Sequence, residues 1–446
     1  MTQSHPLLGK IPAAVRAVRK AAPVIRAAGA AAPRYTLPAD APTRVPDPNG
    51  RLGWKTTMLK VLLGTRTDPN PTPEQFTEFV RFLNKGDPLA DGVVAWMHQH
   101  GHRDARALIE RASNHGIDSI PDAPPALRAF FEQVEFVPLW VDPAKLDLGC
   151  DAHRRTGPMA ELVLRNVALM GGYVAAAATK PLAFTAQLDK ATARRLVETG
   201  KYWVEVTTRG SLMPFQPGWK TSIHVRLMHA QVRYMLNRSD KWDRAAWGEP
   251  LNQADTVATN LLFSYIFLHS LRALGFRFTP EERESVIHLW RYAGYLMGVD
   301  DRLLPASEDD AARIAFMNFL TLAEPDEDSQ RLAQSLLDVS WEFGEKTPGM
   351  PRWVTSIEYN YRAGFSRLIL GKQTSDMLGI PDNAVKFGVL ATVPLVYGFE
   401  TLRRAIPGAT QLVVKAGEML HERGLQHAID TYNADTTFTP VKQLAR

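Results

Sequence analysis

Cysteine is nearly absent from this chain of 446 residues, in which Cys150 is the only one. Internal disulfides and metal clusters held by several thiolates are therefore excluded. Covalent attachment of a c-type haem is excluded as well, because it requires a Cys-x-x-Cys-His segment. A lone cysteine of this kind is typically a small buried apolar group rather than a nucleophile.

Long uninterrupted hydrophobic runs are also missing. The two most hydrophobic stretches, 162–178 and 257–274, contain polar residues, and we expect both to form buried core helices. A third stretch, from Ala384 to Phe399, contains Lys386 and Pro394. It is too short and too interrupted to predict a membrane span, although it could dip into a membrane surface.

The chain has little excess of charge of one sign, since a net charge of +5 is small for its length. It has no zinc-finger spacing and no basic–aromatic stacking motif, so we expect no nucleic-acid partner. Pro12, Arg16 and Arg19 interrupt the apolar stretch that a secretory signal would need. We therefore expect a cytoplasmic protein, with an exported form as the alternative if a preceding segment has been removed.

Helical patterns are abundant, whereas the period-2 alternation of strands is almost missing. A capping residue followed by acidic residues, in two cases with an intervening proline, marks three helix starts. These begin at Thr72, at Thr279 with a helix through Met297, and at Ser307 with a helix to Leu322. We predict an all-α fold.

Composition divides the chain into four parts. Residues 1–50 form a basic leader arm rich in Ala and Pro, with a short helix near 11–20. Residues 51–155 are predicted as an N-terminal helical extension, 156–325 as the core, and 326–446 as a C-terminal helical extension. A chain of this length exceeds what one hydrophobic core usually organises.

The most informative segment runs from Ser222 to Tyr234. On a helix, Arg226, His229 and Arg233 have the spacing i, i+3, i+7 and project from one face. A histidine between two arginines should be neutral, which leaves a lone pair for a metal. A b-type haem needs one such axial nitrogen and cationic partners for its propionates. The alternative is a histidine satisfied by a backbone carbonyl, with both arginines in surface ion pairs.

Two further clusters lie on either side of this segment. Arg195, Glu198 and Thr199 share one helix face, which on its own would indicate no more than a surface Arg–Glu pair. Downstream, Asn252 or Asp255 could cap a helix, and Thr259 lies one turn beyond Asp255.

Together the three clusters resemble the catalytic domain of the rubber oxygenases. That family includes the latex-clearing proteins and the MpaB-type oxygenases that shorten a prenyl side chain. The resemblance covers about 155–325, and it rests on Arg195-x-x-x-Thr199, Arg226-x-x-His229-x-x-x-Arg233 and Gly248-x-Pro250-x-Asn252-Gln253-x-Asp255-x-x-x-Thr259. The segments Leu274-Gly275-Phe276 and Trp290-Arg291-Tyr292 continue it.

The resemblance implies a globin-like helical core that holds haem b, so that 156–325 would be the haem-binding oxygenase core. It implies that His229 is the proximal iron ligand. Arg226 and Arg233 would orient the haem or its propionates, and Thr259 would belong to the cofactor-binding residues.

The resemblance also implies a reaction, in which O2 cleaves an isoprenoid carbon–carbon double bond to leave an aldehyde and a ketone. Arg195 and Thr199 would lie on the distal side, near where oxygen binds. Latex-clearing members have a lysine directly before the distal threonine, whereas this chain has Glu198 there. Glu198 cannot cap the iron as lysine does, but it could act as a base, so we count it with the catalytic residues. This departure puts long-chain rubber in doubt as the substrate.

Several alternatives stay open. The chain could cut the prenyl tail of a small molecule, as MpaB-like enzymes do, or it could be a helical protein that holds haem or an apolar ligand without turnover. His269 or His288 would be the ligand if the resemblance misleads, and His98 with His102 shares a helix face without completing a recognisable metal site. We expect an apolar isoprenoid partner, contact with a membrane or polymer surface as a further option, and a monomer or small homo-oligomer.

Overall fold

The computed structural model describes residues 34–51, 68–185 and 192–434. Every regular element in these ranges is a helix, so the prediction of an all-helical fold is confirmed. The predicted helix near 11–20 and most of the leader arm lie outside the described residues.

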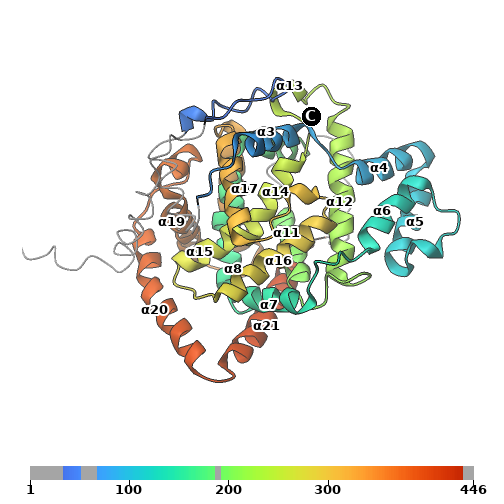
Figure 1. The fold of residues 1–446 in the computed structure, drawn as a ribbon. Coiled ribbons are helices and arrows are strands. Elements are labelled where there is room, and N and C mark those ends of the chain that lie inside the picture. The colour runs from blue at the N-terminus through green and yellow to red at the C-terminus, as the bar shows by residue number, and fades with distance from the viewer. Residues whose placement is uncertain (1–33, 52–67, 186–191, 435–446) are drawn as a thin grey trace, which may run out of the picture.

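The largest group of helices packs around one apolar core (Figure 1). Its members are α4 (Pro88–His100), α6 (Pro125–Glu135), α7 (Pro143–Arg154), α8 (Pro158–Val163), α11 (Thr192–Val206), α12 (Pro217–Leu236), α15 (Phe267–Ala273) and α16 (Pro280–Leu296). Helix α5 (His102–His115) packs beside α4 and also contributes side chains to this core. In Figure 1, α4, α5 and α6 lie on one side of the long helix α12, and the rest of the molecule lies on the other side.

Two smaller cores complete the body. One is formed by α3 (Pro73–Arg81), α14 (Gln253–Leu261) and α17 (Glu308–Thr321), and the other by α9 (Met170–Gly172), α18 (Glu327–Lys346) and α19 (Arg352–Met377). The remaining helices are α10 (Ala176–Thr185), α13 (Arg244–Trp247), α20 (Val385–Ala405) and α21 (Ala409–Tyr432). In Figure 1, α20 and α21 form a V-shaped hairpin at the edge of the molecule.

The predicted helix starts are confirmed, because each is set by local hydrogen bonds. Thr72 accepts a hydrogen bond from the backbone N–H of Gln75, whose side chain accepts one from the N–H of Thr72. Thr279 begins α16 with the same reciprocal arrangement, and Ser307 caps α17. Of the two candidates for capping α14, the structure selects Asn252.

The two most hydrophobic stretches are buried, as expected, and each contains a π-helical segment. These segments, Leu164–Leu169 and Leu262–Ile266, pack against one another. A π-helical turn inserts one extra residue into a helix and often occurs near functional sites. Here the two π-helical segments lie at the mutual contact of the two apolar stretches.

Helix α20 differs from the expectation for the third hydrophobic stretch. The helix continues through Pro394 to Ala405 and reaches 21 residues, longer than the 384–399 run. By length and composition, α20 is the one single helix in the described part of the chain that could cross a membrane. Only 11% of its most apolar 18-residue segment is buried. The bent pair Pro158–Gly172 and Ala176–Phe184, with an angle of 101°, would count as a second candidate if taken as one span.

His153 occupies the centre of the largest core and is completely buried. Its Nδ1 lies 2.7 Å from the carbonyl oxygen of Gly149, to which it donates, and its Nε2 accepts a hydrogen bond of 3.0 Å from Trp290 Nε1. Both ring nitrogens are satisfied only when the imidazole is neutral. Burial accordingly lowers the pKa of His153 to about 4.

We therefore expect the free energy of unfolding to fall as the pH drops from about 6.5 towards 4. In that window His153 becomes protonated in the unfolded chain but stays neutral in the folded protein, so proton binding favours unfolding. The stability that this residue contributes above the unfolded-state pKa is therefore lost, by at most about 3 kcal/mol. Urea titrations at several pH values measure the slope. His153→Gln, which keeps a donor and an acceptor, should reduce it, whereas the same change at the exposed His115 should not; equal slopes in both variants would contradict the assignment.

Candidate functional site

His229 lies in the third quarter of α12, partly enclosed and facing a small cavity. Burial and, to a smaller extent, the nearby Arg233 lower its pKa to about 4, so the imidazole is neutral at physiological pH. Among the described residues, no hydrogen bond reaches either ring nitrogen. The alternative of a histidine satisfied by a backbone carbonyl therefore does not apply, and a lone pair is free to bind a ligand.

Arg226 lies one turn before His229 and is held by an aspartate from the start of α4. Its Nε donates to Asp87 Oδ2 at 2.6 Å and its Nη2 donates to Asp87 Oδ1 at 3.0 Å, while both side chains are at most 8% exposed. Nη1 donates to Gln133 Oε1 and to the carbonyl of Leu296. Gly298 passes so close that a Cβ there would lie 2.4 Å from Arg226 Nε.

Arg233 repeats this arrangement one turn after His229. Its Nε donates to Asp91 Oδ1 at 2.8 Å, and its Nη1 donates to the carbonyl of Leu251 at 2.8 Å. The two Arg–Asp pairs join α12 to α4 on either side of the histidine. Both arginines are thus paired, as the second interpretation of the sequence held. The Arg226–Asp87 pair is buried, whereas Arg233 is buried and its partner Asp91 is 36% exposed.

The cavity beside His229 has a volume of about 10 Å³, which is room for roughly one water molecule. Besides the histidine and its two arginines, it is lined by Asp87, Leu251, Gln253, Thr256, Met297 and Gly298. Gln253 connects these walls, because its amide donates to the carbonyls of Gly86 and Gly298. The sequence did not single out Asp87, Asp91 or Thr256 as site residues; Asp87-Pro88 was readable only as a helix start.

The predicted distal residues lie on α11, which runs antiparallel to α12. Tyr202 hydrogen-bonds Ser222 and Glu205 accepts from Thr221, which fixes the register of the pair. The structure thus places the two predicted groups on adjacent helices.

Arg195 and Glu198, two of the predicted distal residues, form polar contacts with the carbonyl of Leu182 and within α11. Arg195 donates to the carbonyl of Leu182 at 3.0 Å, and burial lowers the pKa of its guanidinium. Glu198 accepts from Arg194 at 2.9 Å, so it forms an Arg–Glu pair, but with Arg194 instead of the Arg195 of its own face. Thr199 is half-buried. The catalytic roles of Arg195, Glu198 and Thr199 stay predictions.

Thr259 lies on α14, where its hydroxyl donates to the carbonyl of Asp255 at 2.9 Å and its side chain is exposed. Its assignment to the cofactor stays a prediction. Asp255 itself forms an ion pair of 2.8 Å with Arg44 from the chain before α3.

The other candidate histidines are engaged elsewhere. His269 Nε2 lies 3.2 Å from Glu308, and His288 Nε2 accepts from the backbone N–H of Asp142 at 2.9 Å. His98 Nε2 lies 3.1 Å from Gln231 and its ring packs edge-on against His102, but no group of three or more potential metal ligands occurs among the described residues. His229 therefore differs from His98, His269 and His288 in that, among the described residues, neither of its ring nitrogens has a hydrogen bond.

The comparisons with known proteins agree with this geometry. Residues 160–395 match the family model of the catalytic domain of the ER-bound oxygenases mpaB/B′ and rubber oxygenase. The chain belongs to this family. It is therefore an oxidoreductase of the oxygenase type, and the matched residues run from α8 into α20.

A curated relative is the rubber oxygenase of Streptomyces sp. (strain K30). It is 23% identical over 320 residues, which cover 70% of this chain and 75% of that protein. Among solved structures, a latex clearing protein in the closed state matches with a TM-score of 0.58 and 22% identity, over 76% of this chain and 91% of that one. This likeness shows a shared helical fold, as predicted.

The side chains present fit a haem at one point, the axial ligand. His229 supplies a neutral imidazole with no competing hydrogen bond among the described residues, which is what one axial position of a b-type haem requires. Arg226 directs its donors at Asp87, Gln133 and a backbone carbonyl. Its assignment to a propionate, like that of Arg233, stays a prediction.

Proposed function

We propose that this protein is a b-type haem oxygenase that cleaves a carbon–carbon double bond of an isoprenoid to an aldehyde and a ketone. The observation that carries the proposal is the free, neutral His229 in a member of an oxygenase family. Haem, when bound, would supply the oxygen chemistry, and the protein would supply its orientation and electrostatics.

The residues of this chain have separate roles in the proposal. His229 would hold the iron, and the two Arg–Asp pairs fix the helix that carries this histidine. Arg195 and Thr199 supply hydrogen-bond donors for negative charge that develops as the reaction proceeds. Glu198 would take up a proton near these donors, in place of the lysine that latex-clearing members have.

The substrate proposed here is polyisoprene or a shorter isoprenoid. A curated relative is named a rubber oxygenase, which supports the alkene chemistry. Glu198 favours a shorter substrate, because it departs from the latex-clearing pattern. The second candidate is the prenyl chain of a small molecule, which the match to the mpaB part of the family supports.

The test is an absorption spectrum followed by a product assay. Protein expressed with added haem precursor should show a Soret band that shifts on reduction and again with carbon monoxide. The same sample, incubated in air with polyisoprene latex, squalene or farnesol, should release carbonyl products from at least one of them. A colourless protein would refute the haem oxygenase, and a coloured protein without carbonyl products from any alkene would indicate a carrier.

Arg195→Ala and Thr199→Ala are each expected to keep the Soret band and to lower product formation by about 10²- to 10³-fold, the usual cost of losing one donor to developing charge. Side-by-side spectra and product yields measure this. Arg209→Ala is the control, because Arg209 is an exposed arginine just beyond the end of α11 that pairs with Asp151 and with none of the predicted distal residues. Full activity in both distal variants would show that α11 does not face the reaction.

A further inference from the structure

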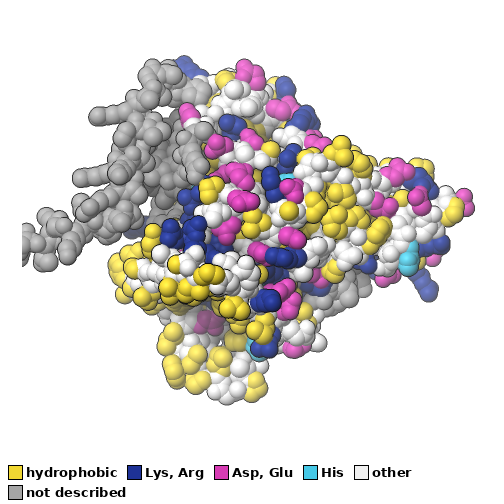
Figure 2. All heavy atoms as spheres, turned by 60° about the horizontal axis from the view of Figure 1, so that its bottom comes forward, with side chains coloured by type: hydrophobic (Ala, Val, Ile, Leu, Met, Phe, Trp, Pro, Cys, Tyr) yellow, Lys and Arg dark blue, Asp and Glu magenta, His cyan; other side chains and the backbone are white. Residues whose placement is uncertain are grey.

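The outward side of α20 is an apolar surface without a partner. Large side chains on it are more than half exposed: Leu395 at 74%, Phe387 at 65%, Leu402 at 60% and Phe399 at 54%. Figure 2 shows a band of hydrophobic side chains along the edge of the molecule that carries this hairpin. A helix on the surface of a soluble protein normally buries such an apolar stripe against the core. An exposed apolar surface of this kind is typical of a site that binds a partner.

The opposite side of α20 lies against the body along its length. Val389 is 1% exposed, and Glu400 and Arg403 are also buried. Between them, a Cβ on Gly275 would lie 2.6 Å from the carbonyl oxygen of Val393, so the two backbones are in close contact. Since one side is committed to the protein, α20 cannot cross a bilayer by itself and can only lie along a surface.

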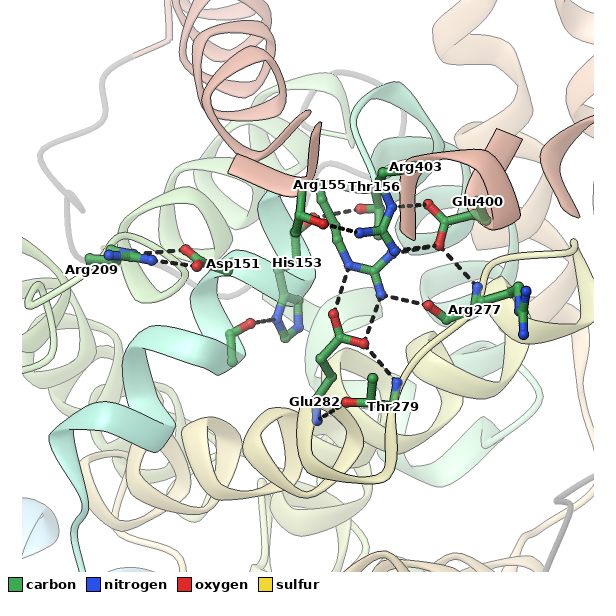
Figure 3. Close-up of polar contacts among 12 residues, drawn as sticks. Asp151, His153, Arg155, Thr156, Arg209, Arg277, Thr279, Glu282, Glu400 and Arg403 are labelled. Carbon is green, nitrogen blue, oxygen red and sulfur yellow. Dashed lines mark hydrogen bonds and ion pairs between the residues drawn. The ribbon is translucent and has the colours of Figure 1, made fainter. Parts of the chain in front are cut away.

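A buried ion-pair network holds the far end of α20 in place (Figure 3). Glu400 is fully buried and accepts from Arg155 at 2.9 Å, from Arg403 at 3.0 Å and from the backbone N–H of Arg277 at 3.1 Å. Arg155 also pairs with Glu282, which forms the capping box of α16. The helix is therefore a fixed part of the fold, and its apolar side is displayed in one orientation.

The end of the hairpin extends this apolar surface and adds positive charge. Ile406 and Leu412 are exposed on either side of the turn that joins α20 to α21. Arg404 and Lys415 are exposed beside them, and neither takes part in an ion pair within the described chain. Between Phe387 and Leu402 the exposed residues of α20 carry no charge, because Glu400 is buried.

Helix α21 ties this hairpin to the oxygenase core. Its Gly417 lies directly on α7, where an added Cβ would fall 1.8 Å from the carbonyl oxygen of Arg154. His421 lies 2.8 Å from the carbonyl of Gly157 through Nε2, and its ring packs edge-on against Trp203 of α11. The hairpin therefore contacts the helix that carries the predicted distal residues.

We propose that α20 and the turn after it form an interfacial membrane-binding element, seated in the headgroup region of a bilayer that contains anionic lipid. The helix is about 30 Å long, and it combines an uncharged apolar side, aromatic rings and basic residues at its end, as helices that lie in a membrane interface do. Charge argues against a second copy of the chain at the turn, since a two-fold pairing centred there would bring the unpaired cations of both copies together. Anionic headgroups complement the same cations.

The first experiment is vesicle flotation of the full chain, with phosphatidylcholine vesicles and with vesicles that also contain a quarter phosphatidylglycerol. Wild type should float with the anionic vesicles, and less so at high salt. The triple variant Phe387→Glu, Leu395→Glu and Leu402→Glu should bind at least tenfold more weakly, with unchanged circular dichroism because all three side chains are exposed. Leu139→Glu, at a leucine that is 98% exposed in the loop between α6 and α7, is the matched control and should bind like wild type.

A fluorescent reporter tests the location directly. Cys150 is buried, and burial raises the pKa of its thiol to about 12, so an introduced cysteine can be labelled selectively. An environment-sensitive dye on Leu395→Cys should shift to the blue when anionic vesicles are added, whereas the same dye on Leu139→Cys should not. Equal responses at both positions would overturn the proposal.

Two other results would also overturn it. If wild type floats with neither kind of vesicle, a lipid surface is excluded. If wild type is a dimer, the triple variant is a monomer and neither protein floats, the apolar surface belongs to a contact with a second copy of the chain. The proposal does not depend on the haem oxygenase. The triple variant should keep the Soret band and the turnover of a short isoprenoid that wild type accepts, so failure of one proposal leaves the other measurable.

Discussion

His229→Ala is expected to abolish both the Soret band and product formation. The variant removes the free imidazole nitrogen at the site, while the Arg–Asp pairs on either side of it stay in place. Removing a residue that hydrogen-bonds to a metal ligand, rather than the ligand itself, typically lowers metal affinity or activity by about 10- to 100-fold. Loss of the ligand itself should exceed that and bring turnover to background, as spectra and product yields of purified protein will show.

His224→Ala is the control for this prediction. His224 lies on the same helix but is not among the cavity residues, and burial lowers its pKa as well. It should retain the chromophore. A His229→Ala variant that keeps a normal Soret band, when folded as judged by circular dichroism, would refute the proximal assignment.

Asp87→Asn should give the largest loss of stability among single changes near the site. It leaves Arg226 buried without its counter-charge, and breaking one side of a buried ion pair costs about 3–5 kcal/mol. The asparagine can still cap α4, where Asp87 accepts from the N–H of Ala90, so the effect reports the ion pair. We also expect haem to be retained about 10- to 100-fold less tightly, because α12 is no longer held against α4.

Asp142→Asn is the matched control for Asp87→Asn. Asp142 caps α7 in the same way, accepting from the N–H of Ala144 at 2.9 Å, and it forms no ion pair within the described chain. Urea unfolding should show a loss below about 1 kcal/mol for this control. Equal losses of unfolding free energy in the two variants would mean that the ion pair with Arg226 contributes no stability beyond that of the helix cap.

Local interactions made the helices readable from the sequence. The capping residues Thr72, Thr279 and Ser307 act on backbone groups within three or four residues, and this information is contained in the segment itself. The spacing of Arg226, His229 and Arg233 was readable for the same reason, since 3.6 residues per turn places them on one face.

The tertiary structure alone decided what these side chains meet. Arg226 pairs with Asp87, which is 139 residues away, and no periodicity announces a contact at that distance. Composition alone could not separate a buried core helix from α20, because both are apolar and only packing decides which face is covered. The sequence by itself determined the helices and the common face of Arg226, His229 and Arg233, because both depend on nearby atoms. The structure decided that His229 is free and that α20 is exposed, because both depend on which distant segments fold against them.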